Sequence, residues 1–266
     1  MHTLRPYKLL LKNGSFREGI LLQIGERCGD IAPLPGLSQE TLAEAWEEAK
    51  RLPAPPKLPS VRFALACTES PWPPAFQLPI NALNIYRPAF RSLKLKVGGM
   101  SVEEALIHIH RVPAKVAIRL DFNRQWPLAK LLALAKHFSP EDFDYWEEPT
   151  AEFSELLEFS KCTRFPLALD ESIPEVPYWE LPTLKALVVK PTILGEVPLA
   201  PPGVELIFSS AYESGVGILH LARLALQHNP TRPHGFDPYS QLVQDVFTPK
   251  LLLEKGFLNG DGRRCL

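Results

Sequence analysis

The chain has 266 residues, of which 29 are basic and 30 acidic, and its formal net charge is −1 at pH 7. This balance, without a basic stripe, argues against a nucleic-acid partner, and no apolar run is long enough to span a membrane. A hydrophobic content of 45% is sufficient for one large core, or for a core with a smaller lobe. No signal-peptide pattern opens the chain, so we expect a soluble, cytoplasmic protein.

The first part of the chain indicates a small α+β lobe. Residues 7–12 and 19–24 alternate as two strands around an Asn-Gly pair, which is typical of a hairpin. A loop over 30–36 follows. The next segment predicts a helix that has Ser38 as its N-cap and is stopped near Arg51 by a run of prolines.

The lobe is expected to cover a larger barrel. Residues 59–68 carry small apolar side chains at helical spacing and predict a buried helix. We therefore assign residues 1–80 to a capping domain, within which 57–70 pack the lobe against the barrel. The barrel is expected over 81–250, and residues 251–266 form a C-terminal segment whose role the pattern does not indicate.

From residue 81 on, short apolar runs alternate with helical stretches, which predicts a parallel sheet. The expected fold class is α/β, a modified TIM-type (β/α) barrel with a small α+β capping domain. Prolines crowd the chain after Lys190, so the helix expected there is missing or reduced to a turn. The expected strands are 81–84, 93–98, 115–121, 143–147, 167–170, 185–190, 203–208 and 251–253, with helices at 101–111, 127–137, 152–162, 175–180 and 217–227.

Two lysines stand in the strand over 93–98. Lys94 and Lys96 are two residues apart, so in a strand their side chains point the same way. Two ammonium groups held together in a partly dry place repel each other, which lowers the pKa of one or both and can turn a lysine into a base. An edge strand with solvated lysines explains the same pattern equally well, so the rest of the sequence has to decide.

Four later strands end in charged residues: Asp121, Glu147, Asp170 and Lys190. Because the carboxyl ends of barrel strands meet on one face, we expect these side chains to converge. A single acid at a strand end is usually the N-cap of the next helix. Three acids and a lysine at four successive strand ends are less easily explained as helix caps alone. The three acids offer only oxygen ligands, which favours Mg²⁺ before Mn²⁺ and argues against zinc.

Such a site could remove a proton next to a carboxylate. A cation beside the substrate carboxylate stabilises the enediolate formed on deprotonation. Lys96 is then the natural proton acceptor, and Lys190, from a strand across the barrel, would lie on the opposite face of the carbon. The same arrangement could racemise, cycloisomerise or expel a β leaving group.

These residues resemble the Lys-x-Lys branch of the enolase superfamily, and within it the o-succinylbenzoate synthase family. The use of a lysine base with Mg²⁺ is a general property of that superfamily. The resemblance covers nearly the whole chain and includes a capping-loop segment over 29–41 and a barrel approach over 59–63. The barrel motifs are Lys94-x-Lys96, Arg119-x-Asp121-x-Asn123, Glu147-Glu148-Pro149, Asp170-Glu171-Ser172, Lys190-Pro191-Thr192 and Ser209-Ser210.

The resemblance implies a syn-dehydration of 2-succinyl-6-hydroxy-2,4-cyclohexadiene-1-carboxylate to 2-succinylbenzoate in menaquinone biosynthesis. Lys96 would remove the α proton and protonate the departing hydroxyl, Lys190 would support the enediolate, and Lys94 would tune Lys96. The other implied roles are Mg²⁺ binding by Asp121, Glu147 and Asp170, substrate binding by Arg119, Ser209 and Ser210, support behind these groups by Asn123 and Glu148, and lids formed by 13–19 and 31–36.

Other reactions of the same branch remain open, namely N-acylamino acid racemisation, dipeptide epimerisation and muconate cycloisomerisation, because the metal and the lysines are common to all. The capping loop over 30–36 favours the synthase. A binding or structural barrel with an idle site is a further possibility, against which the retention of all three acids and both working lysines argues. We expect a small-molecule substrate, and the sequence leaves the oligomeric state open, compatible with a monomer.

Four cysteines without paired spacing predict reduced, mostly buried thiols: Cys28, Cys67, Cys162 and Cys265.

Overall fold

The computed structural model describes residues 2–263, which fall into two compact units. The first unit contains the chain up to Ile80, the short segment Val189–Pro198 and the residues from Phe208 on; the second contains Asn81–Val188 and Leu199–Ile207. The second unit thus begins at the residue where the barrel was expected to begin. The functional division into a capping domain, a barrel over 81–250 and a C-terminal segment remains a prediction.

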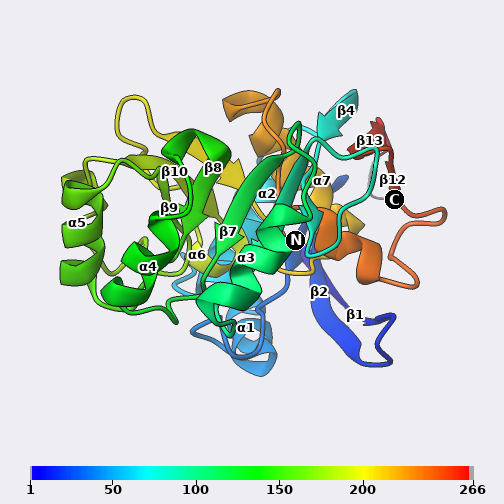
Figure 1. Cartoon of the computed structure of the whole chain (residues 1–266). Coiled ribbons are helices and arrows are strands. Elements are labelled where there is room, and N and C mark those ends of the chain that lie inside the picture. Colours follow the sequence, from blue (N-terminus) through cyan, green and yellow to red (C-terminus); the bar gives the residue numbers. More distant parts are fainter. Residues whose placement is uncertain (1, 264–266) are drawn as a thin grey trace. The chain divides into compact units, whose positions relative to one another are not determined.

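The first unit opens with a three-stranded antiparallel sheet in the order β1-β2-β3 (Figure 1). The hairpin of β1 (His2–Leu10) and β2 (Phe16–Ile24) confirms the expected pair of strands. The third strand, β3 (Arg27–Ile31), was not expected, and it takes in the first two residues of the predicted loop. Two helices, α1 (Leu42–Ala49) and α2 (Pro59–Thr68), pack on this sheet through a core of small and branched side chains.

The N-terminus of α1 differs from the sequence prediction. Its N-cap is Thr41, whose hydroxyl accepts a hydrogen bond from the Glu44 amide, while the Glu44 carboxylate accepts from the Thr41 amide at 2.8 Å. The prediction of Ser38 as the cap was wrong, because only Thr41 has a glutamate three residues later to complete a capping box. Ser38 instead accepts a hydrogen bond from the Leu34 amide at 2.8 Å and closes the preceding loop.

A second antiparallel sheet in the first unit joins distant parts of the chain. Its order is β12 (Leu252–Glu254), β13 (Phe257–Asp261) and β4 (Ala75–Pro79). Only β12 was expected. It pairs with β13 across the two-residue turn Lys255-Gly256, whereas β13 and β4 are brought together from distant parts of the sequence. The unit also contains α7 (Gly215–His228), the 3₁₀ turn η3 (Asp237–Gln241) and the four-residue α6 (Pro191–Leu194), so the helix after Lys190 is reduced as expected.

The second unit is built on a parallel sheet of seven strands in the order β11-β10-β9-β8-β7-β6-β5. Figure 1 labels the neighbouring strands β7 to β10 of this sheet. Neighbouring strands from β5 to β10 run parallel, in the order of the sequence. The alternation of strands read from the sequence is therefore confirmed, with strand boundaries shifted by one or two residues, whereas the helix expected over 175–180 is only a 3₁₀ turn over 178–180. The strands are β5 (Ala82–Leu83), β6 (Ser92–Lys96), β7 (Ala117–Asp121), β8 (Phe143–Glu147), β9 (Leu167–Leu169), β10 (Leu184–Val189) and β11 (Glu205–Phe208).

Helices α3 (Val102–His110), α4 (Leu128–Ala135) and α5 (Phe153–Cys162) connect these strands, with the 3₁₀ turns η1 (Pro140–Asp142) and η2 (Tyr178–Glu180). Trp146 of β8 is fully buried, and its ring lies 5.4 Å from that of Phe159 and 4.6 Å from that of Phe165. This aromatic contact packs α5 against the sheet, which leaves the ends of the strands to form the site.

The cysteines differ in part from the expectation. Cys28 in β3 forms a disulfide, whereas Cys67 and Cys162 are free thiols. The prediction of reduced thiols throughout was therefore wrong for Cys28, since residues that pair in a fold need no common spacing in the sequence; Cys265 lies outside the described residues. Within residues 2–263, no helix is both long and apolar enough to cross a membrane.

Asp30 connects β3 to α7. Its carboxylate accepts hydrogen bonds from the Ser214 amide and hydroxyl, at 2.9 and 2.7 Å, and from the Tyr7 hydroxyl at 2.8 Å. Burial raises the pKa of Asp30 to about 6, although the hydrogen bonds from Ser214 and Tyr7 oppose this rise. The carboxylate satisfies the first turn of α7 from another element, because Ser214, its N-cap, makes no side-chain cap of its own.

We expect Thr41→Ala to lower the free energy of unfolding by about 1 kcal/mol, because it removes the hydroxyl that accepts from the first turn of α1. Thr41→Ser keeps that hydroxyl and is the matched control. Urea denaturation measures both, and an unchanged Thr41→Ala variant would show that the cap contributes nothing.

Asp30 also predicts a dependence of stability on pH. Its pKa is higher in the folded chain than the value near 4 expected after unfolding. Its contribution to stability is therefore full below about pH 4 and is lost as the pH rises through about 6. Relative to Asp30→Asn, the unfolding free energy of the parent should fall by about 2 kcal/mol between about pH 4.5 and 7.5.

Urea titrations at several pH values measure this difference. Glu26→Gln changes an exposed acid in the turn before β3 and is the control that should follow the parent at every pH. Parallel curves for the parent and Asp30→Asn would contradict the assignment.

Candidate active site

The carboxyl ends of β6 to β9 bring charged residues to one edge of the parallel sheet. In the ladder, Lys96 is the partner of Asp121, and Asp121 is the partner of Glu147. Glu147 in turn pairs with Ala168, and Asp170 directly follows the end of β9. The order of acids read from the sequence is thus an arrangement of neighbours in space.

The three acids act on one ammonium group. Lys94 Nζ lies 2.9 Å from Asp121 Oδ2 and 2.5 Å from Glu147 Oε1, and its side chain is only 13% exposed. Burial by itself would lower the pKa of Lys94, but the negative charges of Glu147, Asp121 and Asp170 outweigh it and hold the pKa well above its usual value. The prediction that repulsion between the two lysines lowers the pKa is therefore wrong for Lys94, whose pKa is raised.

Lys96 acts on the same group of acids from an exposed position. Burial alone would raise the pKa of Asp121, but the Lys94 charge and hydrogen bond, together with the Lys96 charge, hold it below the usual range. Both lysines thus act on one carboxylate, as expected for side chains two residues apart. The Lys96 amide donates to Asn84 Oδ1 at 3.0 Å. No role was predicted for Asn84 from the sequence. In the structure its φ is 58°, in the left-handed region that asparagine adopts more readily than most residues.

Glu148 holds the end of β9 in place. Its Oε1 atom accepts hydrogen bonds from the Asp170 amide at 2.6 Å and from the Ser172 amide and hydroxyl at 3.0 and 2.6 Å. Burial raises the pKa of Glu148, against the effect of these donors. Because the carboxylate fixes the backbone on both sides of residue 171, it sets the direction in which Asp170 points.

The backbone at these strand ends is strained. Asn123, Arg124 and Glu148 have φ values of 47°, 60° and 45°, in the left-handed region that side chains other than glycine rarely adopt. The Asn123 amide donates to Asp121 Oδ1 at 3.1 Å, which orients that carboxylate. Strain of this kind is held by the surrounding structure and concentrates at functional sites.

Arg119 lies deeper between the strands than its predicted role in substrate binding suggests. It is fully buried, its Nε donates to Asp144 Oδ2 at 2.8 Å, and its Nη1 donates to Asn81 Oδ1 at 3.1 Å. The guanidinium also lies 4.8 Å from the centre of the Tyr145 ring. Direct contact of Arg119 with the substrate remains a prediction; the structure shows it bound within the sheet.

Asp144 lies inside the strand expected over 143–147, and no role was predicted for it. Between Ile118 and Arg119 the pairing of β7 with β8 shifts by one residue, so that the ladder passes over Asp144. Such irregularities redirect a side chain, and here the carboxylate meets Arg119. An acid inside the apolar run of β8 was the signal that could have found it.

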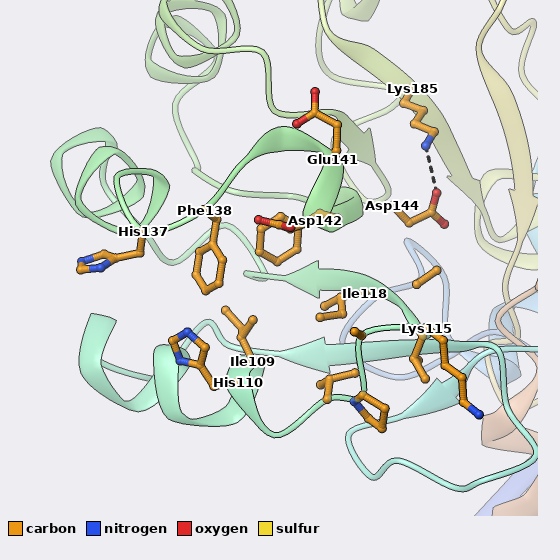
Figure 2. A pocket seen from close by; sticks show the side chains of 16 residues that line it. Ile109, His110, Lys115, Ile118, His137, Phe138, Glu141, Asp142, Asp144 and Lys185 are labelled. Carbon is orange, nitrogen blue, oxygen red and sulfur yellow. Dashed lines mark hydrogen bonds and ion pairs between the residues drawn. The ribbon is translucent and has the colours of Figure 1, made fainter.

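A cavity of roughly 700 Å³ opens at the opposite, amino-terminal ends of the strands (Figure 2). Its lining includes Lys115 before β7, Asp144 near the start of β8 and Lys185 near the start of β10. Figure 2 shows Lys185 directed at Asp144, with Nζ 3.1 Å from Oδ1. None of the predicted catalytic, metal-binding or substrate-binding residues lines this cavity. Asp144 thus joins the cavity wall to Arg119.

The remaining predicted residues belong to the first unit. Lys190 is the N-cap of α6. Ser210 is 4% exposed and its hydroxyl donates to Glu213 Oε2 at 2.8 Å, whereas the Ser209 hydroxyl makes a long contact of 3.4 Å with the carbonyl oxygen of Gly235. Their roles toward a substrate remain predictions.

The acid cluster is chemically suited to a hard divalent cation. Asp121, Glu147 and Asp170 are 2%, 1% and 7% exposed and offer only oxygen atoms. Within residues 2–263, no three acid, histidine or cysteine side chains are arranged around a common metal position. The ammonium of Lys94 lies between the first two acids instead. Two of the acids contact this ammonium and the third acts on it by its charge, so the residue types suit an additional positive ion. Binding of Mg²⁺ by the three acids remains a prediction.

Comparison with known proteins bears on this arrangement. Residues 81–180 match the family model described as enolase C-terminal domain-like. The o-succinylbenzoate synthase of Yersinia enterocolitica is 32% identical over 84% of this chain and 83% of its own length. The chain belongs to the o-succinylbenzoate synthase family of the enolase superfamily. Another member, from Pasteurella multocida, is 29% identical over 91% of this chain and 88% of its own.

Solved structures confirm the fold class expected for this family. An o-succinylbenzoate synthase from Thermosynechococcus elongatus, complexed with Mg in the active site, covers 92% of this chain and 96% of its own, with a TM-score of 0.73 and 23% identity. The L-Ala-D/L-Glu epimerase from Bacillus subtilis covers 100% and 97%, with a TM-score of 0.80 and 14% identity. At these identities the similarity shows the fold, a modified TIM-type (β/α) barrel with a capping domain.

We expect Asp144→Asn to destabilise the protein by about 3 kcal/mol, because it removes the carboxylate that compensates a fully buried guanidinium. Glu141→Gln changes an exposed acid that lines the same cavity, and it should stay within about 0.5 kcal/mol of the parent. Thermal and urea unfolding measure both. Equal stabilities of the two variants would show that Asp144 does not compensate Arg119.

Proposed function

We propose that the protein catalyses the syn-dehydration of 2-succinyl-6-hydroxy-2,4-cyclohexadiene-1-carboxylate to 2-succinylbenzoate, a step of menaquinone biosynthesis. The observation that carries the proposal is the contact of the Lys94 ammonium with two buried strand-end carboxylates, Asp121 and Glu147, next to Lys96. The charge of Asp170 also acts on Lys94. The curated relatives of the same family are o-succinylbenzoate synthases, which supports the same reaction here. We place this reaction on a small-molecule substrate in the cytoplasm.

Asp121, Glu147 and Asp170 would hold Mg²⁺, and Mn²⁺ satisfies the same oxygen donors. The ion, when bound, supplies positive charge beside the substrate carboxylate and makes the neighbouring C–H more acidic. The presence of Mg in the active site of the Thermosynechococcus elongatus relative supports this choice. Glu148 and Asn123 serve it indirectly, because their hydrogen bonds orient Asp170 and Asp121.

The two lysines divide the work. Lys94 is held by ion contacts with Asp121 and Glu147, at 2.9 and 2.5 Å, so its ammonium is already bound to the acids and serves as a fixed positive charge. Lys96 therefore takes the α proton. The same group then gives a proton to the departing hydroxyl on the same face; the C–O bond breaks, water leaves, and the ring becomes aromatic. General acid–base catalysis of this kind contributes about 10²- to 10⁴-fold to the rate.

The other predicted residues complete the proposal. Lys190 would support the enediolate by its charge, and Ser209 and Ser210 would bind the substrate. Arg119, bound between Asp144 and Asn81, would act from beneath the acids rather than on the substrate directly. These assignments follow from the family pattern and are supported here by residue type and burial.

The test is product identification. Incubation of the purified protein with the cyclohexadiene substrate and Mg²⁺ should give the ultraviolet band of 2-succinylbenzoate, and a chelator should abolish it. Parallel incubations with N-acylamino acids and dipeptides, followed by polarimetry, examine the racemase and epimerase alternatives. Racemisation without the aromatic product would overturn the proposal, and no activity on any of them would favour a binding or structural barrel.

We expect Lys96→Ala to reduce kcat by at least about 100-fold, because it removes the group that both accepts and returns the proton. Lys115→Ala, at the opposite ends of the strands, is the control and should leave kcat unchanged. Steady-state kinetics with the cyclohexadiene substrate measures both. A Lys96→Ala variant with full activity would mean that another residue is the base.

A further inference from the structure

Arg17 of β2 is a buried arginine whose hydrogen bonds all go to backbone carbonyl groups. Arg17 is only 4% exposed. Nη1 donates to the carbonyl oxygens of Glu18 at 2.9 Å and Pro33 at 2.8 Å, Nη2 donates to that of Ala32, and Nε donates to that of Tyr212 at 3.2 Å. Only a guanidinium has enough donors, in a fixed planar fork, to serve four acceptors in this way.

Apart from that of Glu18, the next residue of β2, these carbonyl groups come from two segments: the capping loop and the turn after the predicted substrate-binding residue Ser210. Residues 30 and 31 of the loop expected over 30–36 belong to β3, and the loop closes at Ser38, so the capping loop in the structure is 32–38 and opens with Ala32 and Pro33. Tyr212 lies in the turn over 211–214 that follows Ser210. Both segments belong to the first unit. The two are far apart in the sequence, so Arg17 provides a connection between them that the chain itself does not.

The capping loop is fixed at its beginning and closed on itself beyond it. Ala32 is fully buried and Pro33 is buried as well, whereas the tip over 35–37 is exposed. At the other end, Ser38 accepts from the Leu34 amide at 2.8 Å and its own amide donates to the Leu34 carbonyl at 2.9 Å. The loop therefore has the contacts of a preformed element rather than those of a hinged lid.

The turn over 211–214 is fixed equally well. Buried Glu213 accepts hydrogen bonds from the hydroxyl of Thr192 at 2.7 Å, from that of Ser210 at 2.8 Å and from the Ala211 amide at 2.7 Å. Tyr212, whose carbonyl meets Arg17, has a φ of 63°. A strained residue held on both sides keeps its position only while these contacts persist.

We propose that Arg17 is a positioning residue that joins the capping loop to the turn after Ser210, so that both are preformed for the substrate. The inference rests on the proposed function, in which Ser210 binds the substrate, and on the position over the site that the resemblance implies for the loop. It departs from the lid over 31–36 expected from the resemblance, since the first part of that segment is held by the guanidinium before any substrate arrives.

Hydrogen exchange of the intact protein tests the connection without using activity. In Arg17→Lys, which keeps the charge but loses the fork, amides over 32–38 and 211–214 should exchange at least about tenfold faster than in the parent. Arg27→Gln is the matched control, because Arg27 lies in the same sheet but donates to a single exposed carbonyl, that of Glu69. Unchanged exchange in Arg17→Lys would overturn the proposal.

The parent protein gives a second measurement, which decides the matter even if Arg17→Lys does not fold. A preformed loop should show the same exchange over 31–38 with and without 2-succinylbenzoate. A large slowing of exchange on addition of this product would show that the loop closes as a lid and would overturn the proposal.

Kinetics separate positioning from a general loss of structure. Arg17→Lys should raise KM about tenfold while kcat changes by less than about threefold, because substrate binding is weakened and the base is untouched. A lower kcat at unchanged KM would instead indicate a smaller folded fraction, and would count against the proposal. If the parent itself makes no 2-succinylbenzoate, the proposed function fails, whereas Arg17→Lys exchange still decides the role of Arg17.

Discussion

The ion contact between Lys94 and the buried acids is the constraint on which the rest of the site depends. Glu147 and Asp121 are almost completely buried, and carboxylates in such a position require positive charge close by. Lys94 supplies it at 2.5 and 2.9 Å, and the acids in turn hold Lys94 protonated. This mutual dependence fixes Lys94 between the two acids, and in the proposed mechanism Lys96, two residues on, accepts the proton.

A second charged layer lies under the first. Arg119, the ladder partner of Lys94, is compensated by Asp144, and Asp144 is held also by Lys185 at the cavity wall. Charges of alternating sign therefore continue from the carboxyl ends of the strands toward their amino ends. Because each buried charge has an oppositely charged neighbour, their attraction offsets part of the cost of removing them from water. The shift in pairing between β7 and β8 is what makes this possible.

The first unit uses buried charge for a different purpose. Asp30 satisfies the start of α7 and Arg17 binds carbonyl groups of two separate segments. The described hydrogen bonds of Asp30 and Arg17 do not go to oppositely charged side chains. Each group therefore stabilises the conformation of a backbone segment: Asp30 the start of α7, and Arg17 the two segments that it joins. Rigid loops placed in this way bind a substrate with a smaller loss of conformational entropy than loops that must close over it.

The order of strands and helices and the charged strand ends were predictable from the sequence, because apolar periodicity and the position of an acid after an apolar run are local properties. The N-cap at Thr41 was also predictable, because Glu44 follows three residues later, although Ser38 was the predicted cap. The protonated state of Lys94, the burial of Arg119 against Asp144, the disulfide of Cys28 and the pairing of β13 with β4 were decided only by the tertiary structure. Each of these depends on which distant residues become neighbours and in what register, and a local pattern does not carry that information.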